Sequence, residues 1–191
     1  REQRRALALP TAERHVPPAY IPGEPVLVTI AVSPAPTSAA CAVEDAFPAG
    51  WSVSAVSDGG ELDGVNGRVK WGPFFDANPR LLTYQATPPT TAEGLTTFGG
   101  TASFDGASTV IAGSRQLQAS ARLRVSRGMQ PGQMIVSLAG ESNARYLIET
   151  SLDLTAWETL ISVTVSEGRI SIPVTVSPSE PARFFRARRS D

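Results

Sequence analysis

The sequence predicts an all-β protein made of two tandem β-sandwich modules with an extended N-terminal arm. Short β-branched and apolar runs recur along the chain, glycine and proline punctuate them with 16 residues each, and no long amphipathic helical pattern appears. The 191 residues are enough for two small hydrophobic cores. We therefore expect an arm or linker over residues 1–20, a first sandwich over residues 21–120 and a smaller one over residues 121–191.

The first twenty residues differ from the rest, because a charged stretch, Arg1–Leu9, leads into a proline-rich one. A linker from a preceding domain is the simpler interpretation. The alternative is an extended arm that packs on a neighbouring module through Leu7, Leu9 and Val16. The chain starts with neither a methionine nor a secretory signal, so we expect a processed or excised piece whose signal or anchor lies outside it.

Seven short strands are predicted in the first module, each bounded by turn residues. They are Val26–Val32, Ala40–Ala46, Trp51–Val56, Arg68–Trp71, Leu81–Thr87, Thr96–Phe104 and Ser108–Ala112. Seven strands over roughly a hundred residues fit an immunoglobulin-like sandwich.

Five further strands are predicted beyond a boundary near residues 115–127. They are Met134–Leu138, Tyr146–Thr150, Thr159–Val165, Arg169–Val176 and Arg183–Ala187. A module of this size is a small sandwich, of fibronectin type III size or slightly less.

Four motifs of the first module resemble the prokaryotic immunoglobulin-like cell-surface repeat domain. They are Tyr20–Gly23, Asp45–Trp51, Val69–Gly72 and Leu82–Tyr84. Pro-Gly and Pro-Ala-Gly set turns, while Trp71 and Tyr84 are large side chains suited to facing core positions.

The second module resembles a C-terminal, fibronectin III-like module of large secreted bacterial proteins. Tyr146–Trp157 and Ala182–Arg188 carry this likeness. Together the two resemblances cover residues 20–188. They imply export from a bacterium and a role as spacer, docking unit or accessory beside a catalytic domain, and they carry over no catalytic residues.

Charge and cysteine content exclude several classes of function. The net charge is −1, so no overall field attracts nucleic acid or an anionic membrane. Cys41 is the only cysteine, which leaves no internal disulfide and no cysteine metal cluster. No apolar run reaches the ~18 residues needed to cross a bilayer. We expect a protein peripheral to a membrane that does not span it.

The sequence offers no usable catalytic set, and we predict that the chain is not an enzyme. His15, the only histidine, lies in the proline-rich arm, and Cys41 has strand neighbours that favour a small buried apolar role. A carboxylate pair for glycoside hydrolysis is the remaining catalytic alternative, and its candidate acids are Glu44, Asp45, Glu149, Asp153 and Glu158. No spacing links these acids, and solvated edges or turn caps explain them better.

The segment from Asp58 to Gly67 is the one candidate metal site. Oxygen atoms of Asp58, Asp63 and Asn66 among glycines are ligands that Ca²⁺ accepts. The spacing is not that of an EF-hand, and a long turn is the favoured interpretation. No other cofactor is expected.

One aromatic cluster, the single residue Trp157 and one basic cluster are candidate binding features. Phe74 and Phe75 either cap the open end of the first sandwich or are exposed and bind a sugar or another protein. Trp71 and Trp157 are expected in the cores. The arginines at 183, 186, 188 and 189 are best explained as a solvated edge, since charge on an edge strand discourages strand addition.

These observations lead to a functional hypothesis. The chain is expected to be a non-catalytic structural or interaction module of an extracellular or cell-surface bacterial protein. Its expected partners are proteins, either neighbouring modules or copies of itself, bound through the N-terminal arm. The alternative is a carbohydrate-binding accessory module of a secreted hydrolase, with Phe74, Phe75 or Trp157 as the platform for a polysaccharide.

Overall fold

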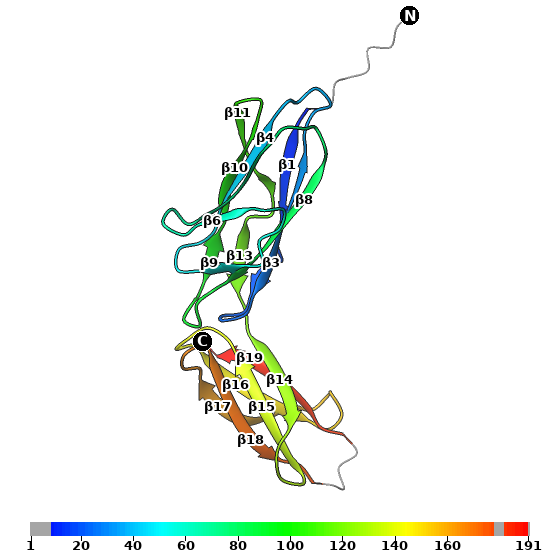
Figure 1. The fold of residues 1–191 in the computed structure, drawn as a ribbon. Helices are drawn as coiled ribbons and strands as arrows, with labels where there is room; N and C mark the ends of the chain where they lie inside the picture. The colour runs from blue at the N-terminus through cyan, green and yellow to red at the C-terminus, as the bar shows by residue number, and fades with distance from the viewer. Residues whose placement is uncertain (1–8, 178–181, 191) are drawn as a thin grey trace, which may run out of the picture. The chain divides into compact units, whose positions relative to one another are not determined.

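The protein is all-β, as the sequence predicts. The structure is a computed structural model that describes residues 9–177 and 182–190. Every regular element in these residues is a strand, and the strands form several sheets consistent with a β-sandwich (Figure 1). No helix among the described residues has the length and apolar character needed to cross a membrane.

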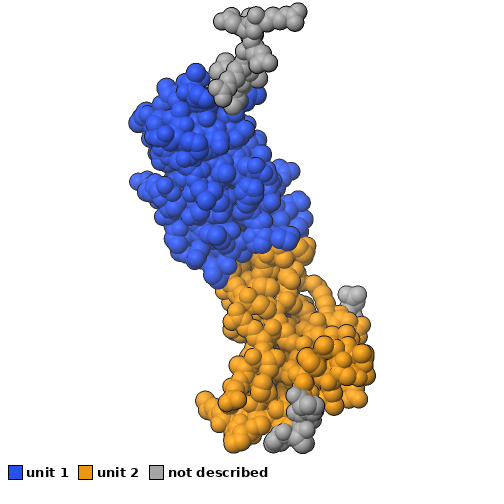
Figure 2. Space-filling view, turned by 90° about the vertical axis from the view of Figure 1, so that its right-hand side faces the viewer, with its two compact units in different colours: residues 1–18, 25–87, 95–117 blue, residues 19–24, 88–94, 118–191 orange. Residues whose placement is uncertain are grey.

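The chain divides into two compact units (Figure 2). Unit 1 comprises residues 1–18, 25–87 and 95–117, and unit 2 comprises residues 19–24, 88–94 and 118–191. The main division therefore lies between residues 117 and 118, near the predicted boundary at 120. Two short segments of the predicted first module, residues 19–24 and 88–94, instead belong to unit 2.

Unit 1 is built mainly from two five-stranded sheets. Sheet 1 has the order β12 (Ala112–Gly113), β1 (Thr11–His15), β3 (Val26–Ser33), β8 (Arg80–Thr87) and β5 (Ser52–Ser54). Sheet 2 has the order β11 (Ala107–Val110), β10 (Gly99–Phe104), β4 (Cys41–Ala46), β7 (Arg68–Phe74) and β6 (Glu61–Asp63). The remaining short strands are β9 (Leu95–Thr97) in unit 1, β2 (Ala19–Tyr20) in unit 2 and β13 (Gln116–Ala119), which spans the division between residues 117 and 118.

The core of unit 1 follows from strict alternation along its strands. In β3 every second residue, from Val26 to Val32, is buried, and in β8 the buried residues are Leu82, Tyr84 and Ala86. Trp71 of sheet 2 meets Tyr84 of sheet 1 with ring centroids 5.9 Å apart. Full burial of such a side chain stabilises the fold by about 1.5–3 kcal/mol. The predicted core positions of Trp71 and Tyr84 are confirmed.

Residues 11–15 and 19–20, which the sequence pattern assigns to an arm or linker, lie in the strands β1 and β2. β1 pairs antiparallel with β3, from Thr11 opposite Ser33 to His15 opposite Thr29, and parallel with β12. Two features hide β1 in the sequence. It lies among prolines, and one of the inward positions of the strand is Arg14, a charged residue whose partner is distant in sequence. The predicted anchor Leu7 lies outside the described residues.

Unit 2 contains two three-stranded sheets. Sheet 3 has the order β14 (Arg122–Arg127), β15 (Gln133–Ala139) and β18 (Arg169–Thr175). Sheet 4 has the order β17 (Glu158–Thr164), β16 (Arg145–Ser151) and β19 (Phe184–Ser190). The core between them consists of Val136, Leu138, Tyr146, Ile148, Val163, Val165 and Val174. The five predicted strands are present, and β14 is an addition within the predicted boundary region.

Buried polar contacts attach the two short segments to unit 2. Tyr20 is buried and donates its hydroxyl hydrogen bond to the carbonyl of Gly94, at 3.2 Å. The carboxylate of Glu141 accepts the backbone N–H of Gly94 at 3.0 Å and pairs with Arg189. These contacts link residues far apart in sequence, which is why the sequence pattern placed both segments in the first module.

Candidate functional site

The turn between β7 and β8 is the best-defined candidate binding feature. The Asp76 carboxylate accepts the backbone N–H of Asn78 at 2.8 Å and a hydrogen bond from Arg80 Nη2 at 2.6 Å. Arg80 Nη1 also donates to the carbonyl of Asn78, at 2.9 Å. The hydrogen bond from Arg80 lowers the pKa of Asp76, so the carboxylate remains charged and the turn remains braced at neutral pH.

The two phenylalanines of this turn have different roles. Phe74 is partly buried, and the guanidinium of Arg80 lies 3.9 Å from its ring centroid. Phe75 is 79% exposed. A large aromatic side chain on a braced turn loses little conformational freedom on binding, which is the property of a docking anchor.

Two further apolar side chains lie at the same end of sheet 1. Leu81, 62% exposed, lies opposite Ala31, and Leu9, 82% exposed, comes two residues before Thr11, which lies opposite Ser33. We call Leu9, Phe75 and Leu81 the Phe75 end of unit 1. The sequence singled out Leu9 and Phe75 for separate reasons, and strand register places them at one end.

The remaining predicted anchor, Val16, lies elsewhere in unit 1. It follows β1 and lines a shallow hollow with Pro18 and the segment 113–116. Of the two predicted anchors that the structure describes, Leu9 and Val16, only Leu9 therefore belongs to the Phe75 end.

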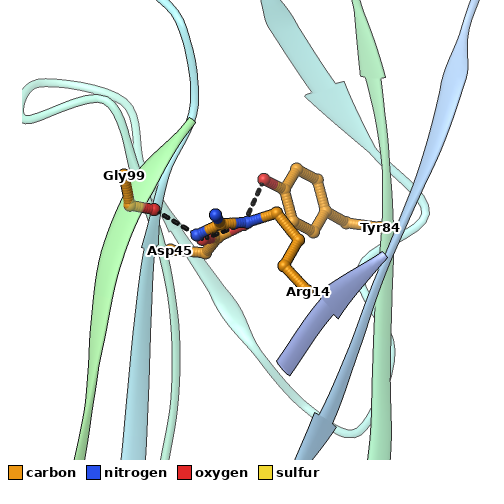
Figure 3. A network of polar contacts seen from close by, with 4 residues as sticks. All are labelled: Arg14, Asp45, Tyr84 and Gly99. Carbon is orange, nitrogen blue, oxygen red and sulfur yellow. Dashed lines mark hydrogen bonds and ion pairs between the residues drawn. The ribbon is translucent and has the colours of Figure 1, made fainter. Parts of the chain in front are cut away.

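A buried network in unit 1 explains one of the candidate carboxylates (Figure 3). Asp45 and Arg14 are almost fully buried, and Arg14 Nε donates to the Asp45 carboxylate at 3.0 and 3.3 Å. Arg14 Nη2 donates to Asp45 and to the carbonyl of Gly99, and Tyr84 Oη donates to Asp45 at 2.7 Å. Burial raises the pKa of Asp45, while the hydrogen bonds from Arg14 and Tyr84 oppose that rise.

This network joins β1 of sheet 1 to β4 of sheet 2 across the interior of unit 1. Burial and the Asp45 carboxylate raise the pKa of Tyr84. Since every group is enclosed and paired within the protein, Asp45 has no path to a substrate. Its role is structural, and no sequence pattern pairs it with Arg14, 31 residues away.

The other candidate carboxylates are engaged separately. Glu44 pairs with Arg68 at 2.6 Å on the outside of sheet 2, and Glu149 pairs with Arg186 at 2.6 Å on sheet 4. Asp153 accepts the backbone N–H groups of Thr155 and Ala156, which lower its pKa. These contacts account for Glu44, Glu149 and Asp153 as ion pairs and turn caps, while Glu158 is exposed at the start of β17.

The predicted calcium loop is arranged as a hydrogen-bonded turn around Asp63. The Asp63 carboxylate accepts the backbone N–H of Asn66 at 3.1 Å, its side-chain amide at 2.9 Å and Lys70 Nζ at 2.7 Å. These hydrogen bonds lower the pKa of Asp63. Asp58 lies in a turn with a φ of 52°. Within residues 9–177 and 182–190, His, Cys, Asp and Glu side chains form no group of three that could hold a metal ion.

Cys41 and His15, the two residues considered for nucleophilic catalysis, lie on different strands. Cys41 is buried on β4, as predicted, and burial raises the pKa of its thiol. His15 is exposed at the end of β1, opposite Thr29.

Trp157 is partly buried and does not belong to the core cluster of unit 2, where the sequence pattern placed it. Its indole N–H donates to the carbonyl of Leu154 at 3.1 Å, and the Arg186 guanidinium lies 4.2 Å from its ring centroid. The loop beside it borders a hollow of about 230 Å³, lined in part by Ser151, Asp153 and Arg183. The Leu-Thr-x-Trp pattern did not reveal this position, because a cation–π contact with β19 covers the ring instead of the core.

No protein-family model matches the chain, and no curated protein matches its sequence.

Proposed function

We propose that the chain is a non-catalytic interaction module of an extracellular or cell-surface bacterial protein, and that it docks another protein through the Phe75 end of unit 1. The proposal includes the finer architecture, an immunoglobulin-like sandwich followed by a smaller fibronectin III-like one. The resemblance of the Pro-Gly, Trp and Leu-Thr-Tyr motifs supports the family and the location outside the cell.

The exposure of Phe75 carries the docking proposal. A phenylalanine that is 79% exposed, next to a phenylalanine covered by Arg80, contributes little to folding. Aromatic anchors of this kind contribute a large share of binding energy where they enter a pocket on a partner. Leu9 and Leu81 are further exposed apolar side chains at this end of sheet 1.

Site-specific photo-crosslinking tests this proposal. A benzoylphenylalanine in place of Phe75, in cells that make the full-length protein, should yield one dominant cross-linked protein. The same residue in place of Val65, which is 96% exposed on another loop of unit 1, is the matched control. Equal products from both positions, or none from Phe75, would refute docking at this end.

A carbohydrate-binding accessory role is the second candidate, and the same exposed aromatic ring supports it. Binding of soluble polysaccharides to the chain and to its Phe75→Ala variant distinguishes the two. Polysaccharide binding that the substitution abolishes favours this role, whereas absence of binding removes it.

A further inference from the structure

The outer face of sheet 2 carries charge in rows that alternate in sign from strand to strand. Glu44 on β4 is negative, Arg68 and Lys70 on β7 are positive, and Glu61 and Asp63 on β6 are negative. Arg68 pairs with Glu44 at 2.6 Å, and Lys70 pairs with Asp63 at 2.7 Å. The pattern ends on a negative row, because β6 is the edge strand of the sheet.

The outer face of sheet 4 shows the complementary ending. Glu149 on β16 accepts hydrogen bonds from Arg186 and Arg188 on β19, at 2.6 and 3.5 Å. The carboxylate is nearly buried, whereas the arginine side chains are 46% and 64% exposed. Here the pattern ends on a positive row at an edge strand, β19.

We propose that β6 of one copy of the protein pairs antiparallel with β19 of a second copy. In this register Glu61 lies opposite Arg188 and Asp63 lies opposite Arg186. Alternate residues of a strand repeat at about 6.8 Å, so two acids and two arginines spaced two apart meet in pairs. Edge strands in general carry main-chain N–H and C=O groups that have no partner in their own sheet, and strand addition satisfies such groups.

The apolar residues between these charges agree with the register. Leu62 on β6 lies opposite the buried Val69, and Ala187 on β19 lies opposite the buried Ile148. Both therefore point to the inner side of their sheets. When β6 pairs with β19, the inner face of sheet 2 in one copy continues into the inner face of sheet 4 in the other. The pairing then covers Leu62, which is 50% exposed.

A second copy fits this edge because the chain itself carries the required complement. Residues 1–120 hold eight basic and eleven acidic side chains, a net −3, and residues 121–191 hold nine and seven, a net +2. The contact is heterologous, so each copy offers one β6 and one β19, and assembly proceeds head to tail.

Sedimentation of the purified chain tests the contact. We expect concentration-dependent association that weakens at least tenfold in Kd between low and high salt, since the charged pairs are screened. Glu61→Arg and Arg188→Glu should each weaken association at least tenfold, and the double variant that carries both substitutions in one chain should restore it. Glu61 is an exposed residue at an edge, so its substitution leaves unit 1 folded even if the β19 variant is destabilised.

The register supplies the matched control. The double variant Glu61→Arg, Arg186→Glu brings like-charged pairs into the proposed register at every contact and should not restore association. A wild-type chain that stays monomeric up to about 1 mM, the weak end of measurable affinity, overturns the proposal. Equal association of the two double variants, or association unaffected by Glu61→Arg, also overturns it. Phe75→Ala leaves the association unchanged, so this result is separate from the function proposed for the Phe75 end.

Discussion

Substitution of Arg14 by methionine should destabilise unit 1 strongly. The side chain is almost fully buried, and the change leaves the Asp45 carboxylate enclosed without its counter-ion. Removing one partner of a buried ion pair typically costs about 3–5 kcal/mol, because the remaining charge is still desolvated. We therefore expect Arg14→Met to lower the free energy of unfolding by about 3–5 kcal/mol.

Removing the whole network should cost far less than removing one member. The triple variant Arg14→Met, Asp45→Leu, Tyr84→Phe replaces both charges and the phenol hydroxyl by apolar groups of similar volume. Such replacements are often close to neutral. The Gly99 carbonyl, which loses its donor, belongs to an exposed residue and can accept a hydrogen bond from water. The triple variant should therefore lie within about 1.5 kcal/mol of the wild type.

Urea unfolding followed by tryptophan fluorescence measures both changes. Trp51 and Trp71 report on unit 1, and Trp157 reports on unit 2. In Arg14→Met the pKa of Asp45 rises further, because burial acts without the opposing guanidinium. A raised carboxyl pKa in the folded state favours folding below the pKa of the unfolded state, so the deficit of this variant should shrink as the pH falls.

Two results would refute this reasoning. A loss below about 1 kcal/mol for Arg14→Met would mean that Asp45 is not held in a buried environment. A triple variant as unstable as the single one would mean that side-chain volume, and not the unpaired charge, determines the cost.

Three further predictions concern other parts of the chain. Phe75→Ala should change the free energy of unfolding by less than about 0.5 kcal/mol, whereas Trp71→Ala should cost about 3–5 kcal/mol in the same urea assay; equal losses would contradict the assigned roles. Hydrogen bonding from Arg186 lowers the pKa of Glu149, so its stabilisation is present above the unfolded-state pKa and is lost as the pH falls. Thermal unfolding of unit 2 should thus be less acid-sensitive in Glu149→Gln, and superimposable pH profiles would disprove this. Excess Ca²⁺ should leave the melting temperature unchanged, because Lys70 and Asn66 already engage Asp63; a rise would assign the loop to calcium.

Hydrophobic alternation made much of the fold predictable. The runs containing Val26 to Val32 and Leu82 to Ala86 alternate cleanly, and both are strands with one buried face. The large side chains Trp71 and Tyr84 were placed correctly because a bulky residue within such a run has few other places to go. The strand β1 was missed because Arg14 occupies an inward position where an apolar residue would have marked a strand, and β14 was missed because it lies in the segment assigned to the boundary.

The candidate site was only partly predictable. The aromatic pair Phe74 and Phe75 stands out in the sequence, but its division into a covered and an exposed ring depends on Arg80, which follows the turn. Trp157 was misplaced because its partner Arg186 lies 29 positions away, on a strand that sequence periodicity does not connect to the loop. Contacts of this range depend on how strands are ordered in a sheet.

By itself the sequence determined the β class, most strand positions and the two largest core residues of unit 1, because side-chain alternation is a local property of the chain. Only the tertiary structure decided which acids are enclosed, which aromatic ring is exposed and which strands are edges. Strand order brings Arg14 to Asp45 and leaves Glu61 and Arg188 on open edges. The free energy of a charge depends on whether water or a counter-ion surrounds it, and only the folded chain fixes those surroundings.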